Sequence, residues 1–254
     1  MNDVVAQVAA VLAGAKSVVV ITGAGISAES GLRTFRGNER DMDSLWKEFD
    51  PQRLATPEAF EADPEMVTRW YDWRRQGCLA AMPNPGHSAL ARIERELKRR
   101  GGRFTLLTQN VDRLHQKAGS EKVVELHGSI IQWRCVGCGT RSTPGPVAFT
   151  AFPPPAACCQ GILRPDVVWF GEALPFEALR EADEAVSGCD LFFSIGTSSV
   201  VYPAAAYIHA AAGRGAKTVE INKDPTPISR LVTWAMHGKA GELLPRLVER
   251  AFGE

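Results

Sequence analysis

The sequence has no excess of either charge. Its 254 residues include 29 lysines and arginines and 29 aspartates and glutamates, so the formal net charge is zero. A neutral chain creates no global field that would hold nucleic acid or an anionic membrane. We therefore expect no direct nucleic-acid partner, and any recognition of charge must be local.

Long hydrophobic runs and a basic leader are also missing. No stretch of about 18 apolar residues is present, and the first eight residues lack the positively charged start of a secretory signal. Both absences favour a cytoplasmic protein without a membrane partner. Apolar residues still make up 45% of the chain, which is enough for a sizeable core.

Apolar, β-prone runs alternate with helical patterns along the chain, which is typical of an α/β fold with a doubly wound parallel sheet. The predicted buried strands are 17–22, 103–108, 190–195 and 217–221, with a short strand at 122–126. The predicted helices are 4–13, 88–100, 176–186, 204–212 and 241–251. Two stretches break the alternation: 37–81 is rich in Trp, Pro and charge, and 132–164 carries four of the six cysteines.

The first predicted strand leads directly into a glycine turn. Gly23, Gly25 and Ala28 fit the pattern G-x-G-x-x-G/A, whose small residues let backbone N–H groups approach a pyrophosphate. A plain turn is the alternative. Residues 38–46 form a polar loop, where an ordinary Rossmann dehydrogenase has a strand ending in an acidic residue. A nucleotide would therefore be held differently here.

Four sequence blocks, in this order, closely resemble the sirtuins, a family of NAD-dependent protein lysine deacylases. The blocks are 18–37, 108–115, 125–128 and 196–199. The resemblance implies that NAD is consumed: the acyl oxygen of a modified lysine attacks the nicotinamide ribose, nicotinamide leaves, and O-acyl-ADP-ribose and lysine are released. It also implies one catalytic domain over residues 1–254, in which the insertions 37–81 and 132–164 form a small helical and zinc-binding subdomain.

The resemblance implies two catalytic residues. His127, in a Leu-His-Gly motif, is the expected general base, because a neutral imidazole accepts protons near pH 7; a buried histidine satisfied by the backbone is the alternative. Asn110 is expected to orient the nicotinamide ribose and water, and Asp112 to bind the carboxamide, with helix N-capping as its structural alternative. The remaining histidines are expected to be non-catalytic: His87, His115, His209 and His237.

The expected NAD site lies at strand ends and in the loops that follow them. Its residues are Gly23, Ala24, Gly25, Ser27, Glu29, Thr34, Phe35, Arg36, Gln109, Asn110, Val111, Asp112, Gly196, Thr197, Ser198, Asn222, Lys223, Asp224 and Ala240. Asn222 and Asp224 would meet the adenine ribose, although both residue types also form turns. Phe35 would shield the reaction from water, with a core aromatic as the alternative.

Ala55, Tyr71 and Arg74 resemble the signature of the sirtuins that remove succinyl, malonyl or glutaryl groups. Tyr71 and Arg74 are three residues apart and would share one face of a helix, where a phenol and a guanidinium can bind one carboxylate. A solvated arginine beside a core tyrosine is the alternative. We expect succinyl or malonyl preference with acetyl also removed, and a deacetylase with little acidic-acyl preference is the alternative function.

Residues 167–172 form a β-prone segment that ends in glycine and glutamate. In the resembling family this segment pairs with the backbone of an acylated-lysine protein by strand addition, and a buried core strand is the alternative. The expected substrate-binding residues here are Val168, Trp169, Phe170 and Gly171. We expect the protein to act as a monomer.

The cysteines predict a structural zinc site. Cys135 and Cys138 form a C-x-x-C pair, which is half of such a site. The other half is the adjacent pair Cys158 and Cys159, with Ala156 where a C-x-x-C partner of Cys159 would lie. Neighbouring residues point apart in extended backbone, so joint ligation requires a tight turn. Tetrathiolate zinc is the prediction, and a disulfide among these residues is the alternative.

Two other functions use the same blocks. Protein mono-ADP-ribosylation would trap the activated ribose with an amino-acid nucleophile, and a non-catalytic module would bind NAD or a partner alone. The presence of both His127 and Asn110 favours deacylation.

Overall fold

The computed structural model describes residues 2–33, 51–200, 202 and 204–253. Among these residues the larger sheet has six strands, all parallel, in the order β3-β2-β1-β7-β8-β9. Their bounds are β1 Ser17–Thr22, β2 Arg103–Thr108, β3 Val123–Glu125, β7 Leu191–Ile195, β8 Lys217–Asn222 and β9 Trp234–His237. The strand order reverses direction at β1, so the crevice at the carboxyl ends of β1 and β7 is the place where such sheets bind ligands.

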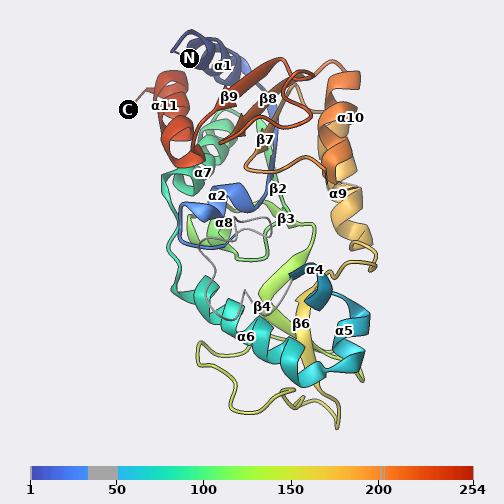
Figure 1. Ribbon diagram of the computed structural model, residues 1–254. Coiled ribbons are helices and arrows are strands. Elements are labelled where there is room, and N and C mark those ends of the chain that lie inside the picture. Colours follow the sequence, from blue (N-terminus) through green and yellow to red (C-terminus); the bar gives the residue numbers. More distant parts are fainter. Residues whose placement is uncertain (1, 34–50, 201, 203, 254) are drawn as a thin grey trace.

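Helices cover both faces of this sheet (Figure 1). On one face lie α1 (Asn2–Gly14), α7 (Pro85–Arg99) and α11 (Ala240–Phe252). On the other lie α9 (Phe176–Ser187) and α10 (Tyr207–Gly213). Strand β1 is buried throughout because its alternate side chains enter the two cores: Val18 and Val20 the first, Val19 and Ile21 the second. The predicted doubly wound α/β fold is confirmed.

A smaller, antiparallel sheet lies at the other end of the molecule (Figure 1). In the described part of the chain it has the order β5-β4-β6, with bounds β4 Gly128–Cys135, β5 Arg141–Ser142 and β6 Leu163–Val167. The helices α4 (Pro51–Leu54), α5 (Pro57–Ala62) and α6 (Pro64–Ala80) share a third apolar core with it. The two predicted insertions thus pack together, although residues 37–50 lie outside the described residues and the predicted boundaries stay predictions.

The predicted elements differ from the observed ones mainly at their ends. Helix α7 begins at Pro85, three residues before the predicted start, because Asn84 caps it and proline suits the first helical turn. Helix α10 begins at Tyr207, after a short 3-10 helix at Ala204–Ala206. The segment 168–170 is not a strand, since β6 ends at Val167. Strand β9 has no counterpart in the sequence prediction.

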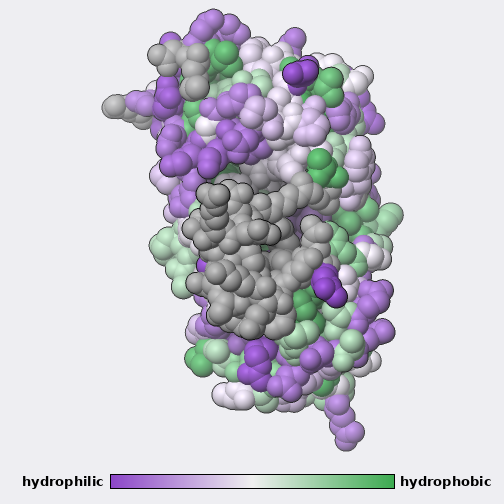
Figure 2. Space-filling view, viewed as in Figure 1, coloured by the Kyte–Doolittle hydropathy of each residue, from purple (hydrophilic) through white to green (hydrophobic). Residues whose placement is uncertain are grey.

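Two short helices complete the described elements near the crevice: α2 (Ala24–Ala28) and α8 (Leu114–Lys117). None of the described helices is both long and apolar enough to cross a membrane. On the face in Figure 2, hydrophilic and hydrophobic residues are intermingled over the coloured area, which agrees with the balanced charge of the sequence.

Candidate functional site

The glycine turn after β1 packs directly against the turn after β7. The Gly23 N–H donates to the Ile195 carbonyl at 3.0 Å, and the Gly25 N–H donates to the Gly196 carbonyl at 2.8 Å. A Cβ on Gly25 would lie 2.7 Å from the Gly196 backbone, so no larger residue fits. The glycines therefore act through close backbone packing, and the N–H groups of Gly23 and Gly25 are used within the protein.

Residues from separate sequence blocks meet at this crevice. Gln109 follows β2 and donates its Nε2 to Thr197 Oγ1 at 3.1 Å. Asn222, at the end of β8, donates its Nδ2 to the Thr197 carbonyl at 3.3 Å. The Asn110 Nδ2 donates to the Gly23 carbonyl at 3.0 Å. The carboxyl ends of β1, β2, β7 and β8 are thus joined by the residues that the sequence singled out.

A buried network follows directly after β2. Asn110 Nδ2 donates to Ser27 Oγ at 3.1 Å, and Ser27 Oγ donates to Asp112 Oδ2 at 2.7 Å. The other oxygen of Asp112 accepts from the Leu114 N–H, at the start of α8. Burial raises the pKa of the Asp112 carboxyl, while these two hydrogen bonds and Arg74 oppose the rise. The predicted N-cap role of Asp112 is wrong, because the N-cap of α8 is Arg113, which makes no side-chain cap bond; Asp112 precedes it and bonds the first helical N–H instead.

His127 lies in the turn between β3 and β4. Its Nδ1 is 3.0 Å from the Gln109 carbonyl oxygen, and its own carbonyl accepts from the Val168 N–H at 2.9 Å. Burial lowers the pKa of His127, and the contact with Gln109 opposes this only in part. The next residue must be glycine: Gly128 has φ +73, and a Cβ there would lie 2.2 Å from the Asp166 carbonyl oxygen.

The other residues predicted for the NAD site lie in several different environments. The Glu29 carboxylate accepts from the Gly241 N–H at 3.0 Å, beside the buried Ala240 that opens α11. Lys223 and Asp224 are exposed in the bend after β8. Half-buried positions are held by Ala24, at the start of α2, and by Val111 and Ser198 in the loops after β2 and β7. The predictions for Thr34, Phe35 and Arg36 lie outside the described residues.

Tyr71 and Arg74 do share a face of a helix, α6. The Arg74 Cζ lies 5.2 Å from the centre of the Tyr71 ring and 4.6 Å from that of Trp70. Tyr71 is buried, and burial raises its pKa against the opposing effects of Arg74, Trp169 and Arg164. Ala55 and Trp169 are buried in the same core, and the rings of Tyr71 and Trp169 are 6.2 Å apart.

Arg75, the neighbour of Arg74, has a different environment that the sequence did not reveal. Its side chain is fully buried and forms an ion pair of 2.7 Å with the buried Asp72. Its Nη1 and Nη2 atoms donate to the carbonyls of Gly145 and Val147 at 2.7 and 2.8 Å. Arg75 therefore ties helix α6 to the loop that follows β5.

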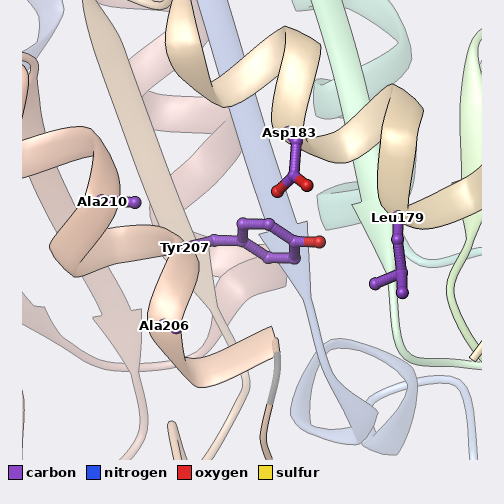
Figure 3. A pocket seen from close by; sticks show the side chains of 5 residues that line it. All are labelled: Leu179, Asp183, Ala206, Tyr207 and Ala210. Carbon is purple, nitrogen blue, oxygen red and sulfur yellow. The ribbon is translucent and has the colours of Figure 1, made fainter.

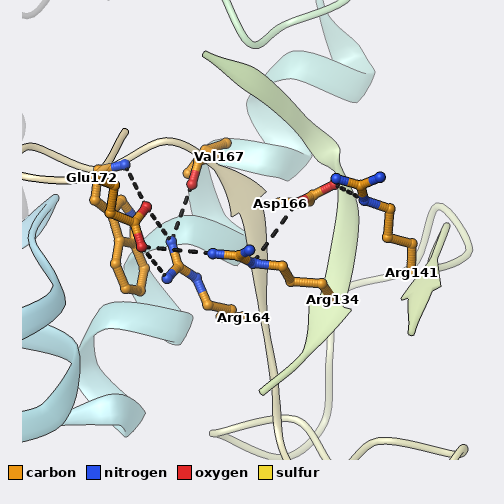
Figure 4. A network of polar contacts seen from close by, with 7 residues as sticks. Arg134, Arg141, Arg164, Asp166, Val167 and Glu172 are labelled. Carbon is orange, nitrogen blue, oxygen red and sulfur yellow. Dashed lines mark hydrogen bonds and ion pairs between the residues drawn. The ribbon is translucent and has the colours of Figure 1, made fainter. Parts of the chain in front are cut away.

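The segment after β6 is held by a second buried arginine (Figure 4). Arg164 donates to both oxygens of Glu172, at 2.6 and 3.0 Å, and to the Val167 carbonyl. Glu172 also accepts from the Trp169 N–H at 2.9 Å, and Arg164 stacks on the Trp169 ring. This clamp fixes the predicted substrate-binding segment. Sequence reasoning missed it, although Arg164 and Glu172 flank that segment.

Most N–H groups of residues 168–171 already form hydrogen bonds within the protein. The Val168 N–H donates to His127, and the Phe170 N–H donates to the Ala55 carbonyl at 2.9 Å. Phe170 and Gly171 are exposed, whereas Trp169 is buried. The segment thus has a buried side and an exposed side but forms no strand of its own, and its pairing with a substrate backbone stays a prediction.

The four clustered cysteines come together at the tip of the small subdomain. Their Sγ atoms all lie within 4.8 Å of one another. The closest pairs are Cys135 with Cys159 and Cys138 with Cys158, each at 3.3 Å, and all four are free thiols. Four thiolates around zinc, each at about 2.3 Å, stand a little under 4 Å apart. The set fits a structural zinc ion, and the turn at Cys158 and Cys159 brings both adjacent thiols into it.

A surface pocket of about 270 Å³ between α9 and α10 lies apart from these residues (Figure 3). The Tyr207 ring lies beside Asp183 there, and burial and that carboxylate raise the pKa of Tyr207 to about 12. None of the predicted site residues lines this pocket.

The Sir2 family model matches residues 23–203, from the glycine turn past the end of β7. The chain belongs to the Sir2 family. It is 51% identical over 244 residues to the NAD-dependent protein deacylase 2 of Pyrobaculum aerophilum, which covers 96% of this chain and 94% of that protein.

Two further similarities support the same family assignment. The chain is 40% identical over 260 residues to the mitochondrial NAD-dependent protein deacylase sirtuin-5 of Xenopus tropicalis, covering 94% of this chain and 83% of that protein. A crystal structure of a Sir2 homologue in complex with NAD superposes with a TM-score of 0.86 at 41% identity, covering 96% and 93% of the two chains. This Sir2 protein is an NAD-dependent protein deacylase.

Proposed function

We propose that this Sir2 protein removes succinyl and malonyl groups from protein lysines in preference to acetyl groups, which it also removes. The observation that carries the proposal is the position of the Arg74 guanidinium over the rings of Trp70 and Tyr71, at 4.6 and 5.2 Å. An acidic acyl chain brings a carboxylate into this apolar core, and a buried carboxylate needs a cation and hydrogen-bond donors.

The environment of Tyr71 favours a donor beside that cation. Because burial raises the pKa of Tyr71, its hydroxyl keeps its proton at neutral pH and can donate to a carboxylate. Ala55 is small and buried in the same core, which leaves room for a longer acyl chain. The aromatic faces of Trp70 and Tyr71 hold the Arg74 guanidinium by cation–π contact.

When bound, NAD supplies an electrophilic ribose carbon with nicotinamide as its leaving group, so that the acyl group leaves lysine as O-acyl-ADP-ribose. We propose His127 as the general base that accepts a proton from a ribose hydroxyl. A carbonyl oxygen only accepts, so the His127 Nδ1 facing Gln109 carries the proton and Nε2 keeps a lone pair. Because burial lowers the pKa of His127, this neutral form is maintained at pH 7.

Asn110 is proposed to orient the nicotinamide ribose. Its side chain is fixed by donation to Gly23 and Ser27, at 3.0 and 3.1 Å, which leaves the amide oxygen to act on the ligand. The substrate backbone is proposed to pair with residues 168–171 by strand addition. The N–H groups of Val168 and Phe170 are used within the protein, so the pairing falls to backbone groups of this segment that these bonds leave open.

The proposal is tested with one peptide carrying acetyl-, malonyl-, succinyl- or glutaryl-lysine, assayed by mass spectrometry with and without NAD. Wild-type protein is expected to have the highest kcat/KM on the succinyl or malonyl peptide. Replacing Arg74 with Met should lower kcat/KM on the succinyl peptide about 10- to 150-fold, as expected for a charge-assisted contact. Tyr71→Phe should act in the same direction but less strongly.

Acetyl-lysine has no carboxylate to lose, so its turnover should change little in the Arg74 variant. Arg69→Met is the matched control, because Arg69 lies on the same helix and its exposed side chain pairs with Glu65. Equal losses on succinyl and acetyl peptides in Arg74→Met would contradict the proposed acyl preference.

A further inference from the structure

Two histidines that the proposed chemistry does not use lie ring against ring beneath the NAD crevice. His87 is on α7 and His115 on α8; both are buried, and their ring centres are 4.8 Å apart with planes inclined by 57°. Among the described residues, His87 Nε2 and His115 Nδ1 are buried without a hydrogen-bond partner. Such groups are rare in folded proteins because desolvation without a partner is costly.

Hydrogen bonds on the far side of each ring decide where its proton lies. The Asn84 N–H donates to His87 Nδ1 at 3.3 Å, so a neutral His87 carries its proton on Nε2. His115 Nε2 lies 2.9 Å from Thr22 Oγ1, and Thr22 Oγ1 donates to Thr108 Oγ1 at 2.9 Å. Because this donation uses the Thr22 proton, His115 Nε2 must donate, and His115 Nδ1 is left as an acceptor.

The two unpartnered atoms are therefore complementary: His87 offers a donor and His115 an acceptor. A rotation of either ring, or one buried water, would complete a hydrogen bond between them. Burial lowers the pKa of His87 to about 4 and holds the pKa of His115 well below its usual range, with His87 contributing to the latter. Both rings are thus neutral at pH 7, as this arrangement requires.

The pair is connected to the residues proposed for deacylation. Thr108 Oγ1, which accepts from Thr22, also accepts from the Asn110 backbone N–H at 3.1 Å. Thr22 and Thr108 are the last residues of β1 and β2 and are paired in register. A run of hydrogen bonds therefore leads from His115 through both threonines to Asn110, and a bond between the two rings would extend it to His87 on α7.

A second run of hydrogen bonds leads from the Asn110 side chain back to the residue before His115. The Asn110 side chain donates to Ser27, Ser27 donates to Asp112, and Asp112 accepts from the N–H of Leu114, next to His115. Together with the backbone that joins Leu114 to His115, the two runs form a closed loop, which restrains each member more than an isolated pair would.

We propose that His87 and His115 are a positioning pair for the deacylation reaction, which fixes Asn110 through the hydroxyls of Thr22 and Thr108. This inference rests on the proposed role of Asn110. It is independent of the acyl preference, because all of its rate measurements use an acetyl-lysine peptide.

The first test is nitrogen NMR of the whole protein labelled with ¹⁵N-histidine at pH 7. His87 and His115 are expected as neutral rings protonated on Nε2, whereas His127 is expected to be protonated on Nδ1 and serves as an internal contrast. His87→Gln, His115→Gln and His127→Asn assign the signals. A charged ring, or an Nδ1-protonated ring, at position 87 or 115 would overturn the proposal whatever the activity of the protein.

The second test separates positioning from stability. Thr22→Val keeps the shape of the side chain but removes the hydroxyl, and should lower kcat about 3- to 10-fold with little change in the KM of the peptide, as expected for one lost hydrogen bond. Thr105→Val is the matched control, since Thr105 is a buried residue of β2 outside the hydrogen-bonded run. It should keep the wild-type kcat.

The third test compares two substitutions of His115, one that keeps a hydrogen-bond donor and one that does not. His115→Gln places an amide donor near the position of Nε2 and should retain most of the kcat that His115→Leu loses. Wild-type kcat in Thr22→Val, or equal kcat in the two His115 variants at equal thermal stability, would refute a positioning role. If the NMR result holds while kcat is unaffected, the pair is structural and the proposed link to Asn110 is wrong.

Discussion

The Nδ1 atom of His127 lies 3.0 Å from the carbonyl oxygen of Gln109. Gln109 also donates its side chain to Thr197, so one residue links the proposed base to the loop after β7. The contact fixes the tautomer of His127 by geometry alone, because only the ring nitrogen can donate. Burial then governs at which pH the His127 ring takes up a second proton, and so how the activity should depend on pH.

The pH dependence of kcat/KM should report a histidine with a lowered pKa. Burial lowers the pKa of His127 below its usual value of about 6.5, so protons compete for the base only at more acidic pH. Measured from about pH 5 to pH 8.5 on an acetyl peptide, the rate should be level near neutrality and should fall to half below about pH 6.5. A half-maximal rate near pH 7.5 would contradict this, and His127→Asn should be inactive at every pH.

Arg75→Met should destabilise the protein strongly. It removes a buried cation and leaves the buried Asp72 carboxylate with the Phe149 N–H as its remaining hydrogen-bond partner among the described residues. Breaking one side of a buried ion pair costs about 3–5 kcal/mol, whereas Arg69→Met, at an exposed pair, should cost at most about 1 kcal/mol. Urea unfolding of both variants measures the difference, and equal midpoints would show that the Arg75 pair contributes nothing.

Purified protein should contain about one equivalent of zinc by elemental analysis, because four thiols converge within 4.8 Å. Chelation should lower the thermal midpoint, since metal binding is coupled to folding. Cys158→Ser should reduce the zinc content, while Cys189→Ser, which lies outside the cluster, should not. Full zinc occupancy in Cys158→Ser would exclude Cys158 as a ligand.

Glu172→Gln should weaken peptide binding. The substitution leaves the buried Arg164 without its carboxylate and loosens the Trp169 backbone at the segment proposed to receive the substrate. The KM for an acetyl peptide should rise about tenfold, in line with the loss of a charge-assisted contact. Glu184→Gln, at an exposed pair with Arg180, is the control. An unchanged KM in Glu172→Gln would mean that the clamp does not order the substrate segment.

Several features followed from the sequence because they are local. A run such as 17–22, whose four central residues are apolar, can be buried on both faces only inside a covered parallel sheet, and β1 has these bounds. Asn110 and Asn222 are predicted to lie at the carboxyl edge of the sheet, because both follow predicted strands and parallel strands end on the same side. The structure has both residues there. Motif order then identified the family. The cytoplasmic location and the monomeric state stay predictions.

The sequence left open every feature that depends on distant packing. The adjacent residues Arg74 and Arg75 look alike in one dimension, yet one lies over two aromatic rings and the other is buried against a loop about 70 residues away. Whether Cys158 and Cys159 could share a metal with Cys135 depended on a turn that spacing does not specify. His87 and His115 became a pair only when α7 packed beside α8. Local periodicity fixes which residues are buried, but the partners of a buried polar group are chosen by tertiary contacts, because only these bring donors and acceptors within hydrogen-bonding distance.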